Sequence, residues 1–135
     1  LGVGGGSTGL HVMSGGEVAL HGFTIRGHAV GALASDGGRY LLDAGWVTDN
    51  TLFGARNDDP TICVTANLIW WGDAAGPNDP SDVDDGCMDA SNESGGDTVS
   101  DDVDWSNYAI NDDLTPVGGI VGGGKKIFMP VAYKQ

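Results

Sequence analysis

The stretch Asn67-Leu-Ile-Trp-Trp-Gly-Asp-Ala-Ala-Gly-Pro77 divides the chain into two parts of different character. The part before it is rich in glycine and in short apolar runs, whereas the part after it is acidic and contains no basic residue before Lys125. Two adjacent tryptophans carry a large apolar area that needs cover, and the Gly-Asp and Gly-Pro steps behind them turn the backbone. The stretch therefore predicts the last coil of a stack, followed by a cap that begins at about residue 73.

Upstream of this stretch, the chain contains a repeat with a period of about 22 residues, a length typical of solenoid proteins. Three ten-residue segments align without gaps at spacings of 23 and 22, namely Val18–Gly27, Leu41–Asn50 and Cys63–Gly72. Each has a β-prone run, then Gly or Asn, then a large apolar residue, which is Phe23, Trp46 or Leu68. A unit this short is stable only when copies of it stack. We therefore predict a β-solenoid of about three coils with these three side chains on equivalent rungs.

The predicted core follows from the same alignment. The side chains expected to point inward are Val18, Leu20, Phe23, Ile25, Trp46, Leu68 and Trp70. The composition agrees with an all-β class, because 24 of 135 residues are glycine and no window shows the apolar period of an amphipathic helix. An antiparallel β-sandwich has similar strand lengths and turn spacings and is the alternative architecture.

The net charge of −13 argues against nucleic acid as a partner, because phosphate binding needs clustered lysine and arginine. A solvated acidic face is the plain interpretation of this charge, and collection of divalent cations is the other. No run of about 20 apolar residues occurs, so the sequence predicts no membrane span. Leu1 is not a translation start, and we expect the chain to be processed or to be the remainder of something longer.

Cys63 and Cys87 belong to no CxxC motif and to no Cys/His cluster with metal-ligand spacing. In an oxidising compartment they would pair and close a loop of about 25 residues, which contributes on the order of 3 kcal/mol in the chain-entropy model. One buried thiol and one loop thiol is the alternative.

The acidic part of the chain contains two candidate ligand or modification sites. Oxygen ligands for a metal gather around Gly86, at Asp79, Asp82, Asp84 and Asp85. Calcium is the only cofactor that this cluster suggests, although the spacing reproduces neither the EF-hand nor the nonapeptide calcium repeat. Asn92-Glu-Ser94 matches the N-glycosylation pattern, which makes Asn92 a candidate for modification.

The sequence offers no arrangement typical of a catalytic site. The basic residues of the predicted solenoid are Arg26, Arg39 and Arg56, whose spacings of 13 and 17 do not match the repeat. The histidines are His11, His21 and His28, and none has a serine or cysteine nucleophile in a recognisable motif. We therefore expect a protein that is not an enzyme.

The C-terminal residues form a segment of their own. We divide the chain into a solenoid with its cap, residues 1–114, and a glycine-rich hinge with a terminal strand, residues 115–135. The residues predicted to form a strand suited to pairing with an exposed edge are Ile127, Phe128, Met129, Val131 and Tyr133. The edge could belong to the same chain or to a neighbour.

Several motifs of the second half resemble a known family. Trp70-Trp-Gly-Asp73, Gly76-Pro77, Gly96-Asp-Thr-Val-Ser100 and Val103-Asp-Trp105 follow one another as in right-handed parallel β-helix proteins of the pectin-lyase-like type. The resemblance covers roughly residues 9–114. Here Leu68 and Ile69 separate Asn67 from the tryptophan pair, and Ser106-Asn-Tyr-Ala109 stands where the family has Pro-Trp-Leu. The resemblance implies a short right-handed parallel β-helix with an acidic, loop-rich C-terminal cap and an extracellular location.

From these observations we expect a secreted, non-enzymatic structural subunit at the cell surface. Its open N-terminal end would be covered by a preceding domain or by another copy, which makes a homo-oligomer or head-to-tail homopolymer the expected partner. The cap would be led by Trp70, Trp71 and Trp105. The alternative function is a carbohydrate-binding or polysaccharide-cleaving module of a larger β-helix protein, in which Trp46, Trp70 and Trp71 stack on sugar rings.

Overall fold

The computed structural model describes residues 7–81, 87 and 91–118. Within these residues the regular structure is made of strands, and no helix that could span a membrane occurs. The strands are β1 (Thr8–Val12), β2 (Glu17–His21), β3 (Thr24–Arg26), β4 (Val30–Ala34), β5 (Arg39–Thr48), β6 (Phe53–Asn57), β7 (Val64–Trp70) and β8 (Val103–Asp104). The prediction of an all-β class is confirmed.

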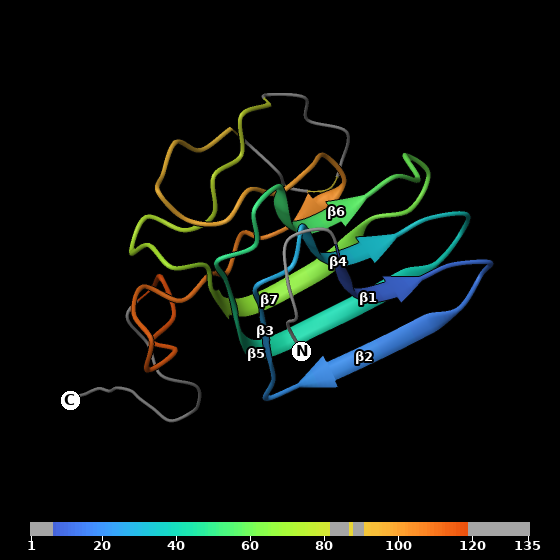
Figure 1. Ribbon diagram of the computed structural model, residues 1–135. Helices are drawn as coiled ribbons and strands as arrows, with labels where there is room; N and C mark the ends of the chain where they lie inside the picture. Colours follow the sequence, from blue (N-terminus) through green and yellow to red (C-terminus); the bar gives the residue numbers. More distant parts are fainter. Residues whose placement is uncertain (1–6, 82–86, 88–90, 119–135) are drawn as a thin grey trace.

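The named strands form two sheets in which every pair is parallel (Figure 1). One sheet has the order β1-β4-β6, and the other has the order β2-β5-β7-β8 with β3 also on β5. Residues 8–26, 30–48 and 53–70 each contribute to both sheets, and we call them layers 1, 2 and 3. Parallel pairing of successive layers excludes the antiparallel β-sandwich for these strands.

The corner between the two sheets repeats from layer 1 to layer 2. Ser14 and Gly15 have φ angles of 55° and 76°, and Asp36 and Gly37 at the same corner of the next layer have angles of 51° and 79°. Asp and Gly tolerate this left-handed backbone better than most residues. The Ser-Gly and Asp-Gly pairs therefore turn the chain at the same point in each of these layers.

The core between the sheets comes from side chains that stack in register. In one sheet Val18 pairs with Tyr40, and Leu20 pairs with Leu42. Ile25 of β3 lies beside Val47 and is fully buried. The other sheet contributes mostly small residues, because its buried side chains include Ala32, Ala34 and Ala55 beside Val12 and Val30. Small residues on one wall leave room for the larger ones on the other.

The predicted alignment of the layers is wrong. Trp46 pairs with Thr24 and with Trp70, so it shares no rung with Phe23, and Leu68 occupies a corner with φ 54°. The ungapped alignment matched large apolar residues to one another. The fold instead aligns the left-handed corners, which are Gly22 (φ 69°), Ala44 (φ 56°) and Leu68. The observed register therefore differs from the ungapped alignment by one position between layers 1 and 2, and by two positions between layers 2 and 3.

After layer 3 the chain leaves the sheets and returns to them. Trp71 is fully buried next to β7, and Val99 then bridges to Ala55 of β6 while β8 pairs with β7. The intervening residues begin at about position 72. A disulfide between Cys63 and Cys87, with Cα atoms 5.6 Å apart, attaches this excursion to the start of β7.

Candidate functional site

The first layer presents a free sheet edge. Among the described residues, β2 pairs with β5 and has no strand on its other side. Val18 and Leu20 are only half-buried there, although their in-register partners Tyr40 and Leu42 are fully buried. The four side chains belong to the same core, so the difference reflects the absence of a further strand over layer 1 among the described residues. An edge of this kind offers both backbone hydrogen bonds and apolar area to a partner.

The hydrogen bonds at the two ends of β2 determine which backbone groups lie on the free edge. The carbonyl of Gly16 accepts from β5, and the N–H of Gly22 donates to it. A strand in a parallel pair directs every second residue to the same neighbour, so the even-numbered residues bond to β5. The residues that direct their N–H and C=O groups outward are Glu17, Ala19 and His21, and all three side chains are exposed.

The opposite end of the sheets is covered. Trp71 and Val103 have no exposed surface, and Trp105 is 8 % exposed. The indole Nε1 of Trp105 donates to Asp79 Oδ2 at 3.0 Å, and the N–H of Ser81 donates to Asp79 Oδ1. Burial raises the pKa of Asp79, because it disfavours the charged carboxylate more than these hydrogen bonds favour it. In the cap, an aromatic side chain that covers the end of the sheets is therefore hydrogen-bonded to a buried carboxyl group.

A pair of tryptophans lies on the outer face of the second sheet. Trp46 and Trp70 are in register and half-buried, and they line a groove of about 440 Å³. The indole Nε1 of Trp46 donates to the carbonyl of Asp112 at 2.9 Å, which fixes one ring. The other residues that line the groove are Thr24, Arg26, Thr48 and Asp112. Two aromatic faces beside hydroxyl groups and a guanidinium can hold a ring that has an apolar face and a polar rim.

A polar ladder crosses the same sheet. His21 Nδ1 lies 2.8 Å from Asp43 Oδ2, and Asn67 Nδ2 donates to Asp43 Oδ1 at 2.8 Å. Asn107 in turn donates to Asn67 Oδ1 at 2.9 Å. The hydrogen bond from Asn67 and the contact with His21 lower the pKa of Asp43. The ladder connects layer 1 to the returning chain, and it contains no serine, threonine or cysteine.

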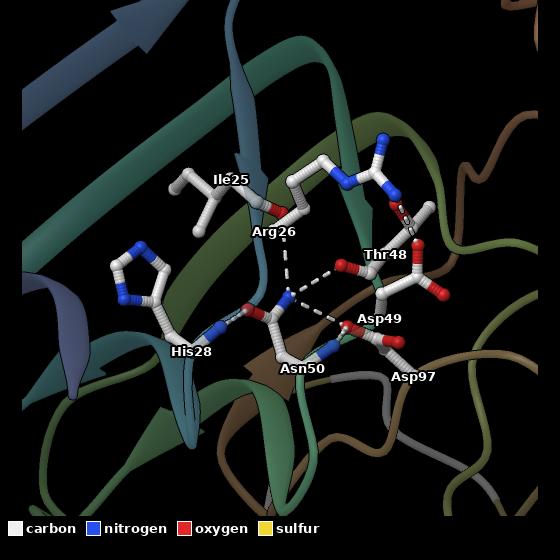
Figure 2. Close-up of polar contacts among 7 residues, drawn as sticks. All are labelled: Ile25, Arg26, His28, Thr48, Asp49, Asn50 and Asp97. Carbon is white, nitrogen blue, oxygen red and sulfur yellow. Dashed lines mark hydrogen bonds and ion pairs between the residues drawn. The ribbon is translucent and has the colours of Figure 1, made fainter. Parts of the chain in front are cut away.

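Asn50 joins three parts of the molecule at the corner after β5 (Figure 2). Its side-chain amide donates to the carbonyls of Ile25 and Thr48 and to Asp97 Oδ2, the last at 2.7 Å, and its oxygen accepts from the N–H of His28. The backbone N–H of Asn50 also donates to Asp97. This residue therefore holds layer 1, layer 2 and the cap together.

The carboxyl group of Asp97 has a raised pKa. Burial raises its pKa to about 6, although the two hydrogen bonds from Asn50 act in the opposite direction. The negative charge of Asp49 adds to the increase, while Asp49 itself pairs with Arg26 at 2.9 Å. Asp97 is consequently a group whose charge changes under mildly acidic conditions.

The structure describes part of the predicted metal cluster. Asp79 lies in a pocket with Asn92, but Asp82, Asp84 and Asp85 fall outside the described residues. Within the described residues, no group of three or more His, Cys, Asp or Glu is placed to hold a metal ion. Both carboxylate oxygens of Asp79 already accept hydrogen bonds from the protein.

The side chain of Asn92 is engaged in the cap. Its Nδ2 donates to the carbonyls of Ala75 and Pro77 at 2.8 and 2.7 Å, and its backbone pairs with Asp79. A glycan on Nδ2 would replace one of these donated hydrogens. Modification at this position would therefore disturb the contact of Asn92 with the chain around Ala75 and Pro77.

The predicted stacking tryptophans divide into two groups. Trp71 and Trp105 are buried in the cap, whereas Trp46 and Trp70 line the outer groove. The predicted inward orientation of Trp46 and Trp70 is wrong. The left-handed corner at Ala44 changes which residues of β5 face the core, so that Val47 is buried and Trp46 is not. The predicted assembly strand, residues 127–133, lies outside the described residues, as does the hinge from residue 119 onward.

Two residues of the site are not predicted by the sequence. Asn50 is the last residue of an aligned segment, and Asp97 lies within the Gly-Asp-Thr-Val-Ser motif, but neither position indicates a contact. The pairing of these two residues joins positions 47 residues apart, which no local pattern reveals. The alternation Glu-Val-Ala-Leu-His in β2, by contrast, predicts a strand with one polar face.

Comparisons with models of known families, with curated proteins and with solved structures find no significant match to this chain.

Proposed function

We propose that the protein is a secreted, non-enzymatic structural subunit that assembles with itself through the free edge of layer 1. In this proposal the parallel layers are coils of a short right-handed β-helix. The observation that carries the proposal is the unequal burial of side chains that are in register in layers 1 and 2. Val18 and Leu20 are half-buried, and the matching side chains of layer 2 are fully buried. Covering such a rung removes apolar area from water and stabilises an assembly.

Two further observations support this function. The Cys63–Cys87 disulfide is typical of an oxidising compartment, which agrees with secretion to the cell surface. At the far end Trp71 and Trp105 are buried, and the last strand of the sheet among the described residues, β8, is only two residues long. A head-to-tail filament therefore needs the predicted strand of residues 127–133 to supply the second half of the contact. Charge favours this, because all 19 acidic residues precede Leu114 and three of the six basic residues are Lys125, Lys126 and Lys134.

Light scattering on the size-separated full chain tests self-assembly. We expect a species heavier than the 13.8 kDa monomer whose amount grows with concentration. Leu20→Lys places a charge on the uncovered rung and should shift the protein to the monomer. Leu52→Lys is the matched control, because Leu52 is 61 % exposed and lies outside the edge. A full chain that remains monomeric at all concentrations would refute the function.

Binding of carbohydrate is the second candidate function, and the outward Trp46–Trp70 pair favours it. Sugar rings present apolar faces that stack on indole, and hydroxyl groups that the threonines and arginine of the groove can bond. The protein would then be a binding module with calcium at most as an accessory ion. Affinity electrophoresis in gels that contain neutral or acidic polysaccharides tests this. Trp70→Ala should reduce retardation about tenfold, and unchanged mobility of the unmodified protein in every gel would exclude the candidate.

A further inference from the structure

We infer that β2 pairs antiparallel with β2 of a second copy, around a two-fold axis at Ala19. This inference rests on the proposed self-assembly and names its contact. It differs from the tail-mediated filament because the same edge serves both partners, so the assembly closes as a dimer.

The backbone of β2 is suited to this pairing. Glu17, Ala19 and His21 direct their backbone groups away from β5, and an antiparallel pair centred on Ala19 sets Ala19 opposite Ala19 and Glu17 opposite His21. All three positions then become hydrogen-bonded pairs, in which each residue exchanges both of its backbone bonds. A shift by one residue would set outward groups against groups already bonded to β5, so the phase of the strand restricts the possible registers.

The side chains of β2 complement themselves in the same register. Glu17 at the start of the strand meets His21 of the second copy, and the reverse contact is made by symmetry. His21 binds Asp43 through Nδ1, which leaves Nε2 as the ring atom that can reach Glu17 of the second copy. On the inner face, Val18 meets Leu20, so the two half-buried rungs cover each other.

The covered end explains why a symmetric contact is favoured over stacking of one copy on the next. A stacked copy would have to place its own layer 1 on the cap, where Trp71 and Val103 are already buried. In two first layers, by contrast, no strand of the described residues covers β2. A contact between identical edges satisfies both copies at once.

Cysteine cross-linking of the full chain tests the two-fold axis. Cα atoms of a hydrogen-bonded antiparallel pair lie about 5.5 Å apart, within the range that a disulfide spans. Ala19→Cys should therefore form a covalent dimer on mild oxidation, and dilution should slow the reaction. His11→Cys is the matched control, because His11 is exposed on β1, the other strand of layer 1 at a sheet edge. The inference is overturned if both variants cross-link equally or if neither does.

Two further variants separate this inference from the proposed function. Ala19→Pro removes the N–H at the axis without removing a bond to β5, and it should abolish the dimer while thermal unfolding shows a folded chain. A chain that ends at Gly118 should still dimerise. If Ala19→Pro assembles normally, or if the shortened chain is monomeric, self-assembly stands and the β2 contact is wrong. A full chain that is monomeric throughout overturns both.

Discussion

At one end of the structure Val18 and Leu20 are half-buried, and at the other Trp71 and Val103 have no exposed surface. Both ends belong to the same stack of parallel layers, and they differ in what covers them among the described residues. The cap end gains its cover within the chain, because the backbone leaves the sheets after Trp71 and returns to pair with β6 and β7. The first layer has no such cover among the described residues. We therefore expect the cap end to contribute to folding stability, and the first layer to contribute to association.

The largest expected difference between the two ends concerns an aromatic side chain from each. Trp71→Ala should lower the free energy of unfolding by about 3–5 kcal/mol, because it opens a cavity in a site with no exposed surface. Phe23→Ala in layer 1 should lower it by only about 1–2 kcal/mol, because its half-buried ring is already in contact with solvent. Denaturant unfolding of both monomeric variants measures the difference. Equal losses would mean that layer 1 is as well covered as the cap.

Removal of the disulfide is the next largest change. The Cys63→Ala and Cys87→Ala double variant should lose about 3 kcal/mol, because the bond closes a loop with a sequence separation of 24 residues. The loss should fall on the cap, so amide exchange should accelerate around Val99 and Val103 before it does in β2. Uniform acceleration across all layers would show that cap and layers unfold together. Reduction of the native protein should reproduce the effect of the double variant.

Glycine substitutions sharpen the comparison at the level of single contacts. A Cβ at Gly96 would lie 2.5 Å from the carbonyl of Gly76 in the cap, and backbone there cannot move aside. A Cβ at Gly45 would also lie 2.5 Å from its neighbour, but that neighbour is the ring of Phe23, a side chain of layer 1 that can turn outward. Gly96→Ala should therefore cost about 2–3 kcal/mol and Gly45→Ala about 1 kcal/mol. The reverse order in thermal unfolding would show that Phe23 is firmly held.

The pH dependence of stability tests the attachment of the cap at Asn50. The pKa of Asp97 is raised to about 6 in the folded protein, from an ordinary value of 3.8. The folded state therefore binds this proton more tightly, and the contribution of Asp97 to stability is fully present below pH 3.8 and is lost as the pH rises through 6. Because Asp97 is partly exposed, we expect about 1–2 kcal/mol.

The Asp97→Asn variant isolates this contribution from the other acids. Its amide keeps an oxygen for Asn50 and cannot ionise, so the difference in stability between the variant and the native protein should grow from pH 4 to pH 7 in favour of the variant. The lowered pKa of Asp43 acts in the opposite direction in both proteins and cancels in the difference. A difference that stays constant with pH would contradict the assignment.

Some features of the fold can be predicted from the sequence, and others cannot. The all-β class and the stacking of successive layers follow from the glycine-rich composition and the repeat of about 22 residues. The register does not, since it depends on Ala44 and Leu68 taking a left-handed backbone that their side chains disfavour. These two left-handed residues change which of the following side chains face the core. Trp46 and Trp70 therefore lie in the outer groove and not in the predicted core.

The smallest expected effect concerns the exposed ion pair beside the groove. Arg26 and Asp49 are 2.9 Å apart with side chains 63 % and 67 % exposed, so Arg26→Ala should change stability by less than about 0.5 kcal/mol. Arg26 belongs to layer 1 and Asp49 to the corner after layer 2, and the cap does not depend on their contact. A larger loss, insensitive to salt, would mean that the pair holds the corner that carries Asn50. Because surface pairs are screened, a loss that disappears in about 1 M salt would identify it as simple electrostatic attraction.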